Sequence, residues 1–145
     1  DWGCVYPAAS PVFLEDEIRL YYGGSDYTHM GWREAYFCLA TLRPDGFAGY
    51  EPKSSRAQAV ITTKPLESYF ASLRITADVK AGGYVEAAVV DKLGKELAHS
   101  KAINETVTNG KVIWRPGWNA VALSSKNIRL KFTLKDAKLY SFEMK

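Results

Sequence analysis

The sequence predicts an all-β fold, an antiparallel β-sandwich of the jelly-roll kind that follows a set of hairpin strands at the N-terminus. Helical signals are scarce, because no long window repeats apolar residues at the i, i+3, i+4, i+7 spacing. Segments that alternate apolar and polar residues recur instead, as in the half-buried strands of antiparallel sheets. Glycine and proline residues separate these segments at the short spacing that is typical of sandwiches.

The N-terminal hairpin strands are expected at residues 10–14, 17–24 and 34–42, which are short and rich in aromatic side chains. A turn follows at residues 43–47, where Pro44 fixes φ near −65° and Gly46 lets the chain bend sharply. We therefore divide the chain into hairpins at residues 1–42 and a sandwich at residues 43–145. Because no low-complexity linker joins them, we expect the two parts to pack tightly as one compact unit.

The strands of the sandwich are expected at residues 73–79, 84–91, 111–114, 127–134 and 137–144. Four apolar residues of the fourth segment share one face, because side chains alternate along a strand: Ile128, Leu130, Phe132 and Leu134. Glycines at residues 80–83 and 91–95 can supply the positive φ of tight hairpin turns. This pattern suits two antiparallel sheets packed face to face.

The composition is that of a globular protein with a core. Of 145 residues, 47% are hydrophobic and 24% are charged, and the net charge is only +3. The nearest thing to a basic run consists of Lys126, Arg129, Lys131, Lys135 and Lys138. We interpret it as a solvated strand face that guards against edge pairing, and we expect no nucleic-acid partner. No apolar run approaches the roughly 20 residues that a membrane helix needs, so no membrane insertion is expected.

Two cysteines, Cys4 and Cys38, lie in strand-like settings near the N-terminus. They could lie opposite each other and form a disulfide, which would stabilise the fold by roughly 3–4 kcal/mol. Two buried free thiols, packed as small hydrophobic groups, are the alternative. Asn104 begins an Asn-Glu-Thr glycosylation sequon in a polar stretch, which favours a secreted or extracellular protein.

Two motifs are distinctive: Leu-Arg-Pro-Asp-Gly-Phe at residues 42–47 and Ala-Lys-Leu-Tyr-Ser-Phe at residues 137–142. Further matching elements are Ile-Arg-Leu-Tyr-Tyr-Gly-Gly-Ser from residue 18, His29, Ile-Thr-Thr-Lys-Pro-Leu from residue 61, residues 82–94, Trp114 and residues 128–136. With these motifs, the chain from about residue 10 to residue 145 resembles the C-terminal region of five-bladed β-propeller proteins related to glycoside hydrolases.

The resemblance implies a last propeller blade at about residues 1–42 and an accessory β-sandwich at about residues 43–145. In such proteins the catalytic carboxylates, where they exist, lie on earlier blades, which are absent from this sequence. The resemblance therefore implies a non-catalytic part of a glycoside-hydrolase-like protein. It also implies that the loop carrying His29 faces the central funnel of a parent propeller, where it could touch substrate.

Asp26, His29 and Glu34 cluster between two of the predicted hairpin strands. One histidine beside carboxylates could bind a metal or shuttle a proton. A metal site needs three or four converging ligands, however, and this segment does not guarantee them. Carboxylates that could hold a structural Ca²⁺ in the sandwich are Asp78, Asp91, Glu96 and Asp136. The alternative is that these carboxylates are solvated or cap turns.

The aromatic residues are the stronger lead, since they make up 13% of the chain. A sugar lays its apolar C–H face on a flat ring while polar side chains fix its hydroxyls. The candidate carbohydrate-binding residues are Trp118, Asn119, Trp32, Tyr27, His29 and Arg33. Partial burial at the base of a loop is the alternative for both tryptophans. Trp114 is interpreted as core, because it alternates with Val112 on a short strand.

Three functions remain open. The favoured hypothesis is a non-catalytic, lectin-like carbohydrate-binding accessory module. The second is a structural or protein-interaction domain without sugar binding, in which the apolar face of the hairpins would be sticky and could cause oligomerisation. The third is a remnant hydrolase. We expect no catalytic residue in this chain, and we expect its partner to be a carbohydrate or a neighbouring protein domain.

Overall fold

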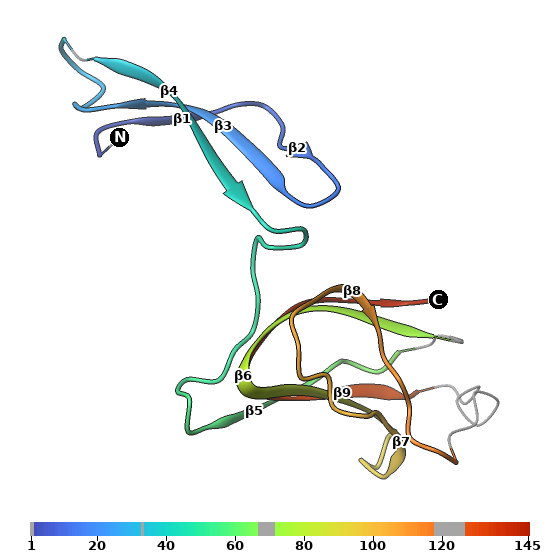
Figure 1. Cartoon of the computed structure of the whole chain (residues 1–145). Coiled ribbons are helices and arrows are strands. Elements are labelled where there is room, and N and C mark those ends of the chain that lie inside the picture. Colours follow the sequence, from blue (N-terminus) through green and yellow to red (C-terminus); the bar gives the residue numbers. More distant parts are fainter. Residues whose placement is uncertain (1, 33, 67–71, 118–126) are drawn as a thin grey trace. The chain divides into compact units, whose positions relative to one another are not determined.

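The computed structural model describes residues 2–32, 34–66, 72–117 and 127–145, and these residues form only strands, turns and loops (Figure 1). The predicted all-β class is therefore confirmed. None of the described residues belongs to a helix of the length and hydrophobicity needed to cross a bilayer. The chain divides into two compact units, Asp1–Phe47 and Ala48–Lys145.

The first unit is a four-stranded antiparallel sheet of β1 (Val5–Pro7), β2 (Val12–Phe13), β3 (Ile18–Ser25) and β4 (Ala35–Leu42). β3 is the central strand, and β4 pairs with it along its whole length. β1 and β2 pair with opposite ends of the other edge of β3. The predicted N-terminal hairpins are thus present as a single sheet.

Residues 43–47 belong to this first unit. The Gly46 N–H donates to the Arg43 carbonyl oxygen at 2.9 Å, which closes a tight turn after β4. A Cβ on Gly46 would lie 2.7 Å from that oxygen, so the turn requires glycine. Phe47 then packs against Phe13, with the ring centroids 6.5 Å apart. The boundary therefore lies after Phe47 rather than after Leu42, and the packing of the two parts as one unit stays a prediction.

The second unit is a five-stranded antiparallel sheet of β5 (Gln58–Thr62), β6 (Leu73–Val90), β7 (Glu96–His99), β8 (Val107–Lys111) and β9 (Arg129–Met144). β6 and β9 pair with each other along most of their length. β5 pairs with β9, whereas β7 and β8 pair with β6. Each long strand replaces two of the shorter strands that the sequence predicted.

Both long strands bend at the point where the sequence predicted a break between two shorter strands, and for β6 the expected break was a hairpin turn. Residues 80–83 do not reverse the chain, and the pairing of β6 with β9 shifts between Val79 and Tyr84. The matching residue of β9 is Asp136, whose φ is +45°. Gly83 approaches it so closely that a Cβ would lie 2.5 Å from the Asp136 carbonyl oxygen. The glycine pair therefore allows a bend within a continuous strand instead of a turn between two strands.

Two other local predictions have different outcomes. The hairpin turn at residues 91–95 is confirmed, because the Asp91 N–H donates to the Lys95 carbonyl and Gly94 has a φ of +83°. The strand predicted at residues 111–114 is displaced towards the N-terminus, since β8 ends at Lys111. Trp114 lies outside β8 and pairs with Ser100 as an isolated bridge.

The bend folds the five-stranded sheet over on itself (Figure 1). Leu73 and Ile75 from the first half of β6 lie in one buried cluster with Val85 and Val89 from its second half. The apolar face that the alternation of β9 predicted, which ends at Leu134, is also buried in this cluster. The predicted β-sandwich is therefore confirmed for the second unit.

Candidate functional site

The sugar-binding candidates of the first unit lie in the loop between β3 and β4, at residues 26–34. Trp32 is 93% exposed and Tyr27 is 53% exposed, so both rings are accessible within this unit. His29 is also exposed. Arg33, the fourth candidate in the loop, lies outside the described residues.

Contacts with β1 and β3 hold this aromatic loop at one end of the sheet. The Tyr6 hydroxyl lies 2.6 Å from Nδ1 of His29. The buried hydroxyl of Ser25 donates to the Tyr27 carbonyl oxygen at 2.9 Å. The Trp2 ring meets the Tyr27 ring edge-on, with the centroids 6.1 Å apart. Aromatic faces and hydrogen-bonding groups are therefore presented together.

The two carboxylates of the loop organise its base. Asp26 Oδ1 accepts a hydrogen bond of 3.1 Å from the Glu34 N–H. The Glu34 carboxylate accepts a hydrogen bond from the Tyr36 hydroxyl, and this bond raises the pKa of Tyr36 above its ordinary value of 10.0. His29 is bonded to Tyr6 instead. Asp26 is thus joined to Glu34, and the histidine is joined to Tyr6.

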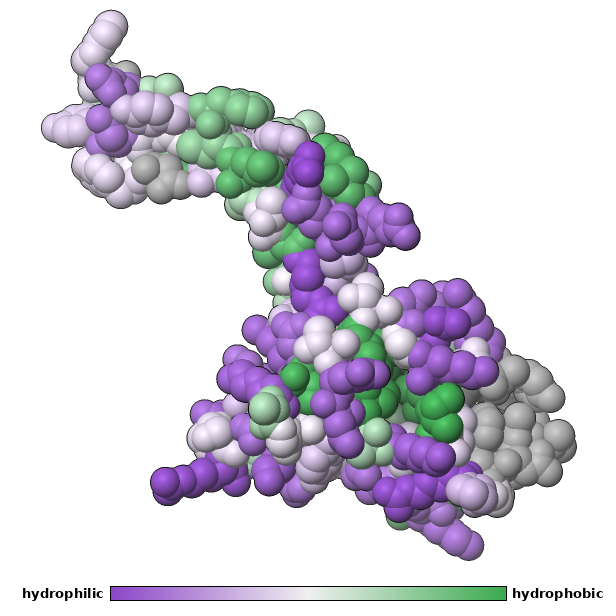
Figure 2. All heavy atoms as spheres, viewed as in Figure 1, coloured by the Kyte–Doolittle hydropathy of each residue, from purple (hydrophilic) through white to green (hydrophobic). Residues whose placement is uncertain are grey.

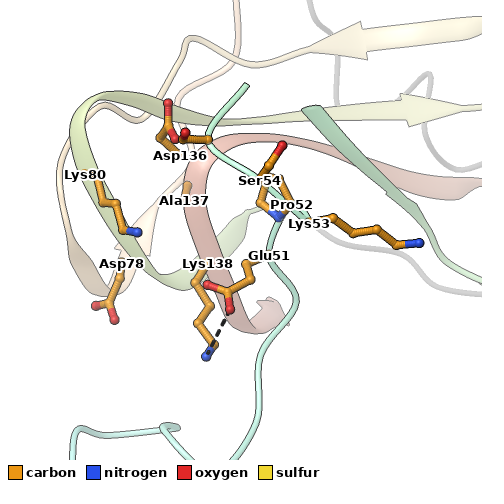
Figure 3. A pocket seen from close by; sticks show the side chains of 10 residues that line it. Glu51, Pro52, Lys53, Ser54, Asp78, Lys80, Asp136, Ala137 and Lys138 are labelled. Atoms are coloured by element: carbon orange, nitrogen blue, oxygen red, sulfur yellow. Dashed lines mark ion pairs between the residues drawn. The ribbon is translucent and has the colours of Figure 1, made fainter. Parts of the chain in front are cut away.

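A second candidate site lies in the sandwich, at the bend of β6 and β9 (Figure 3). A pocket of about 320 Å³ is lined there by residues 51–55, 78, 80 and 136–138. This volume is at the lower end of the range for small-molecule sites. From the sequence, Asp78 and Asp136 could be identified only as separate carboxylates. If the glycines at residues 82–83 had been interpreted as a bend within a strand, the sequence could have indicated that the two carboxylates lie close together.

Polar contacts organise one side of this pocket. The Tyr140 hydroxyl donates to Asp78 Oδ2 at 2.6 Å. The Lys138 amino group lies 4.0 Å from Glu51 Oε1 and 5.6 Å from the centroid of the Tyr140 ring. Tyr140 thus contacts a carboxylate through its hydroxyl and an ammonium group through its ring. These contacts join the segment before β5 to the bent part of β9.

The four carboxylates considered for calcium lie in different settings in the second unit. No group of three or more His, Cys, Asp or Glu residues within the described ranges could hold a metal ion. Asp91 caps the β6–β7 turn, because its Oδ1 accepts hydrogen bonds of 2.8 Å from the N–H groups of Leu93 and Lys95. Glu96 lies 2.8 Å from the His99 ring. For both residues the structural role is the one observed.

The predicted tryptophans of the second unit have separate outcomes. Trp118 and Asn119, the leading candidates of the sandwich rim, lie outside the described residues, so their part in sugar binding stays a prediction. Trp114 is partly buried and packs against the core cluster, as its alternation with Val112 indicated.

Of the two alternatives that the sequence left open for Cys4 and Cys38, the structure shows the one without a disulfide, because both are free thiols. Cys4 lies beside Ser25 on one edge of β3, and Cys38 lies opposite Tyr22 on its other edge. Two strands separated by a third lie about 10 Å apart, beyond the roughly 7 Å that a disulfide allows between Cα atoms. The sequence could not exclude the bond, since it did not show which strands are neighbours.

Comparison with known proteins finds no matching family model, no matching curated protein and no matching solved structure. The relation to propeller proteins that the motifs suggest therefore stays a prediction.

Proposed function

We propose that this chain is an accessory module of a larger β-rich assembly, and that the sheet of residues 1–47 is the part that docks. The observation that supports it is the exposure of large apolar side chains in this unit. Among the described residues of the first unit, the large apolar side chains that are at least two-thirds exposed are Trp2, Phe13, Met30, Trp32 and Phe37. Apolar side chains appear in green over this unit on the side shown in Figure 2.

The exposure affects both faces of the sheet. Tyr36 and Phe37 are neighbours in β4, so they point to opposite faces, and they are 52% and 82% exposed. Leu39 lies on the same face as Phe37 and is 49% exposed. An antiparallel sheet in water normally has one polar face. A sheet with two apolar faces is instead suited to an inner layer of a larger structure.

The occupant that we propose is another antiparallel β-sheet, packed about 10 Å from this one. The sheet carries a mainly apolar cleft of about 300 Å³, lined by residues of β1, β3 and β4 that include Val5, Pro7, Leu20, Tyr22 and Ala40. Such a cleft can receive large apolar side chains from a facing sheet. The motifs that resemble a last propeller blade agree with this occupant, since blades pack face to face.

The experiment is sedimentation of the full chain over a range of concentrations. The exposed sheet should cause self-association, because another copy of the sheet is the nearest available substitute for the partner. The double variant Phe37→Lys, Leu39→Lys should shift the chain towards the monomer. Leu93→Lys, an equally exposed change in the second unit, is the control and should leave the association unchanged. A strictly monomeric wild-type chain would contradict the proposal.

Carbohydrate binding is the second proposed function, and the aromatic loop at residues 26–34 is the specific observation that favours it. Trp32 and Tyr27 offer accessible rings beside the Tyr6–His29 pair. Trp32→Ala and Tyr27→Ala should each weaken the binding of a glycan found on an array by up to about tenfold, if stacking contributes about 1 kcal/mol. Phe37→Ala, which removes an exposed ring of β4, should have no effect. Absence of binding to every arrayed glycan would contradict this proposal.

A secreted or extracellular location is part of the proposal. Asn104 is exposed, and the hydroxyl of Thr106 in the same sequon accepts a hydrogen bond of 3.0 Å from the Val79 N–H. A surface position is what glycosylation of Asn104 requires. Expression through a eukaryotic secretory pathway should add a glycan that a glycosidase removes, and Asn104→Gln should abolish it.

A further inference from the structure

We propose that the pocket at the bend of β6 and β9 binds a neutral, polyhydroxylated ligand of about the size of one monosaccharide. This pocket belongs to the second unit, so it is separate from the aromatic loop of the first unit. The inference extends sugar binding to a new place in the chain. Binding at this pocket is independent of the docking proposed for the first unit.

The charges of the pocket favour a neutral ligand. Its lining contains three carboxylates and three amino groups: Glu51, Asp78, Asp136, Lys53, Lys80 and Lys138. An anion would face the three carboxylates, and a cation would face the three amino groups. A hydroxyl group fits both, because it can donate to a carboxylate and accept from an ammonium group at the same time. Vicinal hydroxyls on a sugar ring match this mixture of donors and acceptors.

The side chains that remain for a ligand can be separated from those that hold the pocket together. Asp78 is bonded to Tyr140, and Glu51 is paired with Lys138. Figure 3 shows Lys53 extending away from the other labelled side chains. The side chains of Asp136 and Lys80 form no hydrogen bond or ion pair with any part of the chain that the structure describes. They are the acceptor and the donor that we assign to the ligand.

The backbone of Asp136 is a second, independent observation. Its φ of +45° lies in the left-handed region, which costs energy for residues other than glycine and is concentrated at functional sites. Gly83 fixes this geometry from the other strand, because its missing side chain leaves room for the Asp136 carbonyl. Glycine would satisfy this backbone position better than aspartate. The presence of a carboxylate here is therefore explained if the carboxylate binds something.

The test is ligand-observed saturation-transfer NMR on the full chain with the methyl glycosides of glucose, galactose and mannose. At least one glycoside should bind, and Asp136→Asn and Lys80→Gln should each weaken its binding about tenfold, the loss expected for a hydrogen bond to a charged group. Asp136→Gly removes the side chain but suits the backbone, so it should fold and bind as weakly as Asp136→Asn. Glu105→Gln, an exposed carboxylate outside the pocket lining, should bind as the wild type does.

Three results would overturn the inference. The first is the absence of a signal from all three glycosides. The second is unchanged binding in Asp136→Asn and Lys80→Gln, and if Trp32→Ala then abolishes the binding, the aromatic loop alone carries the sugar. The third is displacement of the glycoside by sulfate or Ca²⁺ at matched ionic strength, which would assign the pocket to a charged ligand. Binding that survives Trp32→Ala but fails in Asp136→Gly would support the pocket and contradict the loop.

Discussion

The two units of this chain have similar numbers of strands but bury their apolar residues to very different extents. The first unit has four strands and the second has five. In the second unit, Leu73, Val85 and Phe132 are all 0% exposed. In the described part of the first unit the only buried residues are Ile18, Gly24 and Ser25. The number of strands therefore does not decide whether a sheet has its own core.

Strand length explains the difference. β6 has 18 residues and β9 has 16, so a bend in the middle of each leaves two halves that can cover one another. The longest strands of the first unit, β3 and β4, have 8 residues. A sheet of such strands cannot fold over on itself, and both of its faces stay open. The comparison indicates that the second unit has a core of its own, and it agrees with the proposal that another sheet covers the first unit.

The largest effect is expected from removal of the central ring of the sandwich. Phe132→Ala should lower the free energy of unfolding of the second unit by about 3–5 kcal/mol, because the side chain is fully buried in the core cluster. The matched change is Phe37→Ala in the first unit, whose ring is 82% exposed. It should change the stability of the isolated chain by less than about 0.5 kcal/mol.

Urea unfolding, with circular dichroism as the readout, measures both variants. The proposed difference between the units would be contradicted by similar losses of stability in Phe132→Ala and Phe37→Ala. The proposed difference between the units would be supported further if Phe37→Ala reduced self-association and left the unfolding midpoint unchanged.

The bend itself can be tested with two adjacent glycines. Gly83→Ala should destabilise the second unit by about 2–3 kcal/mol, because a Cβ would lie 2.5 Å from the Asp136 carbonyl oxygen and the backbone must shift. Gly82→Ala places its Cβ in open space, so its cost is confined to the φ of +76° and should be about 1 kcal/mol. Equal effects of the two substitutions on the urea midpoint would show that the close approach does not hold the bend.

The sequence predicted the regular part of the sandwich well. The alternation in residues 127–134 identified the buried face of β9, because a side-chain period of two directly reports which residues face a core. The same reasoning failed at residues 80–83. Glycine supports both a hairpin turn and a bend in a strand, and the choice depends on the length and partner of that strand, which only the fold shows.

The candidate sites were predicted less completely. Exposed aromatic residues such as Trp32 could be found from their loop setting. The pocket could not, because Glu51, Lys80 and Asp136 come from segments that are distant in the sequence and meet only at the bend. For a related reason the sequence could not decide between a Cys4–Cys38 disulfide and two free thiols, since it did not show which strands are neighbours. Contacts between distant strands were thus the information that local patterns lacked.

The smallest effects are expected from removing the hydroxyl of a buried serine in each unit, Ser100 in the second and Ser25 in the first. Ser100 is 0% exposed and its Oγ accepts a hydrogen bond of 2.8 Å from the Ala87 N–H. Ser100→Ala leaves that N–H without its partner inside a cooperative unit, so it should lower the free energy of unfolding by about 1–2 kcal/mol.

Ser25 is the counterpart in the first unit. It is 2% exposed, and its hydroxyl accepts a hydrogen bond from the Cys4 N–H and donates one to the Tyr27 carbonyl. Because this sheet lacks a core, Ser25→Ala should act locally, speeding amide hydrogen exchange in β1 and the aromatic loop without moving the unfolding midpoint of the sandwich. If Ser25→Ala lowered that midpoint as much as Ser100→Ala does, the two units would unfold together, and the first would not depend on an external sheet for its order.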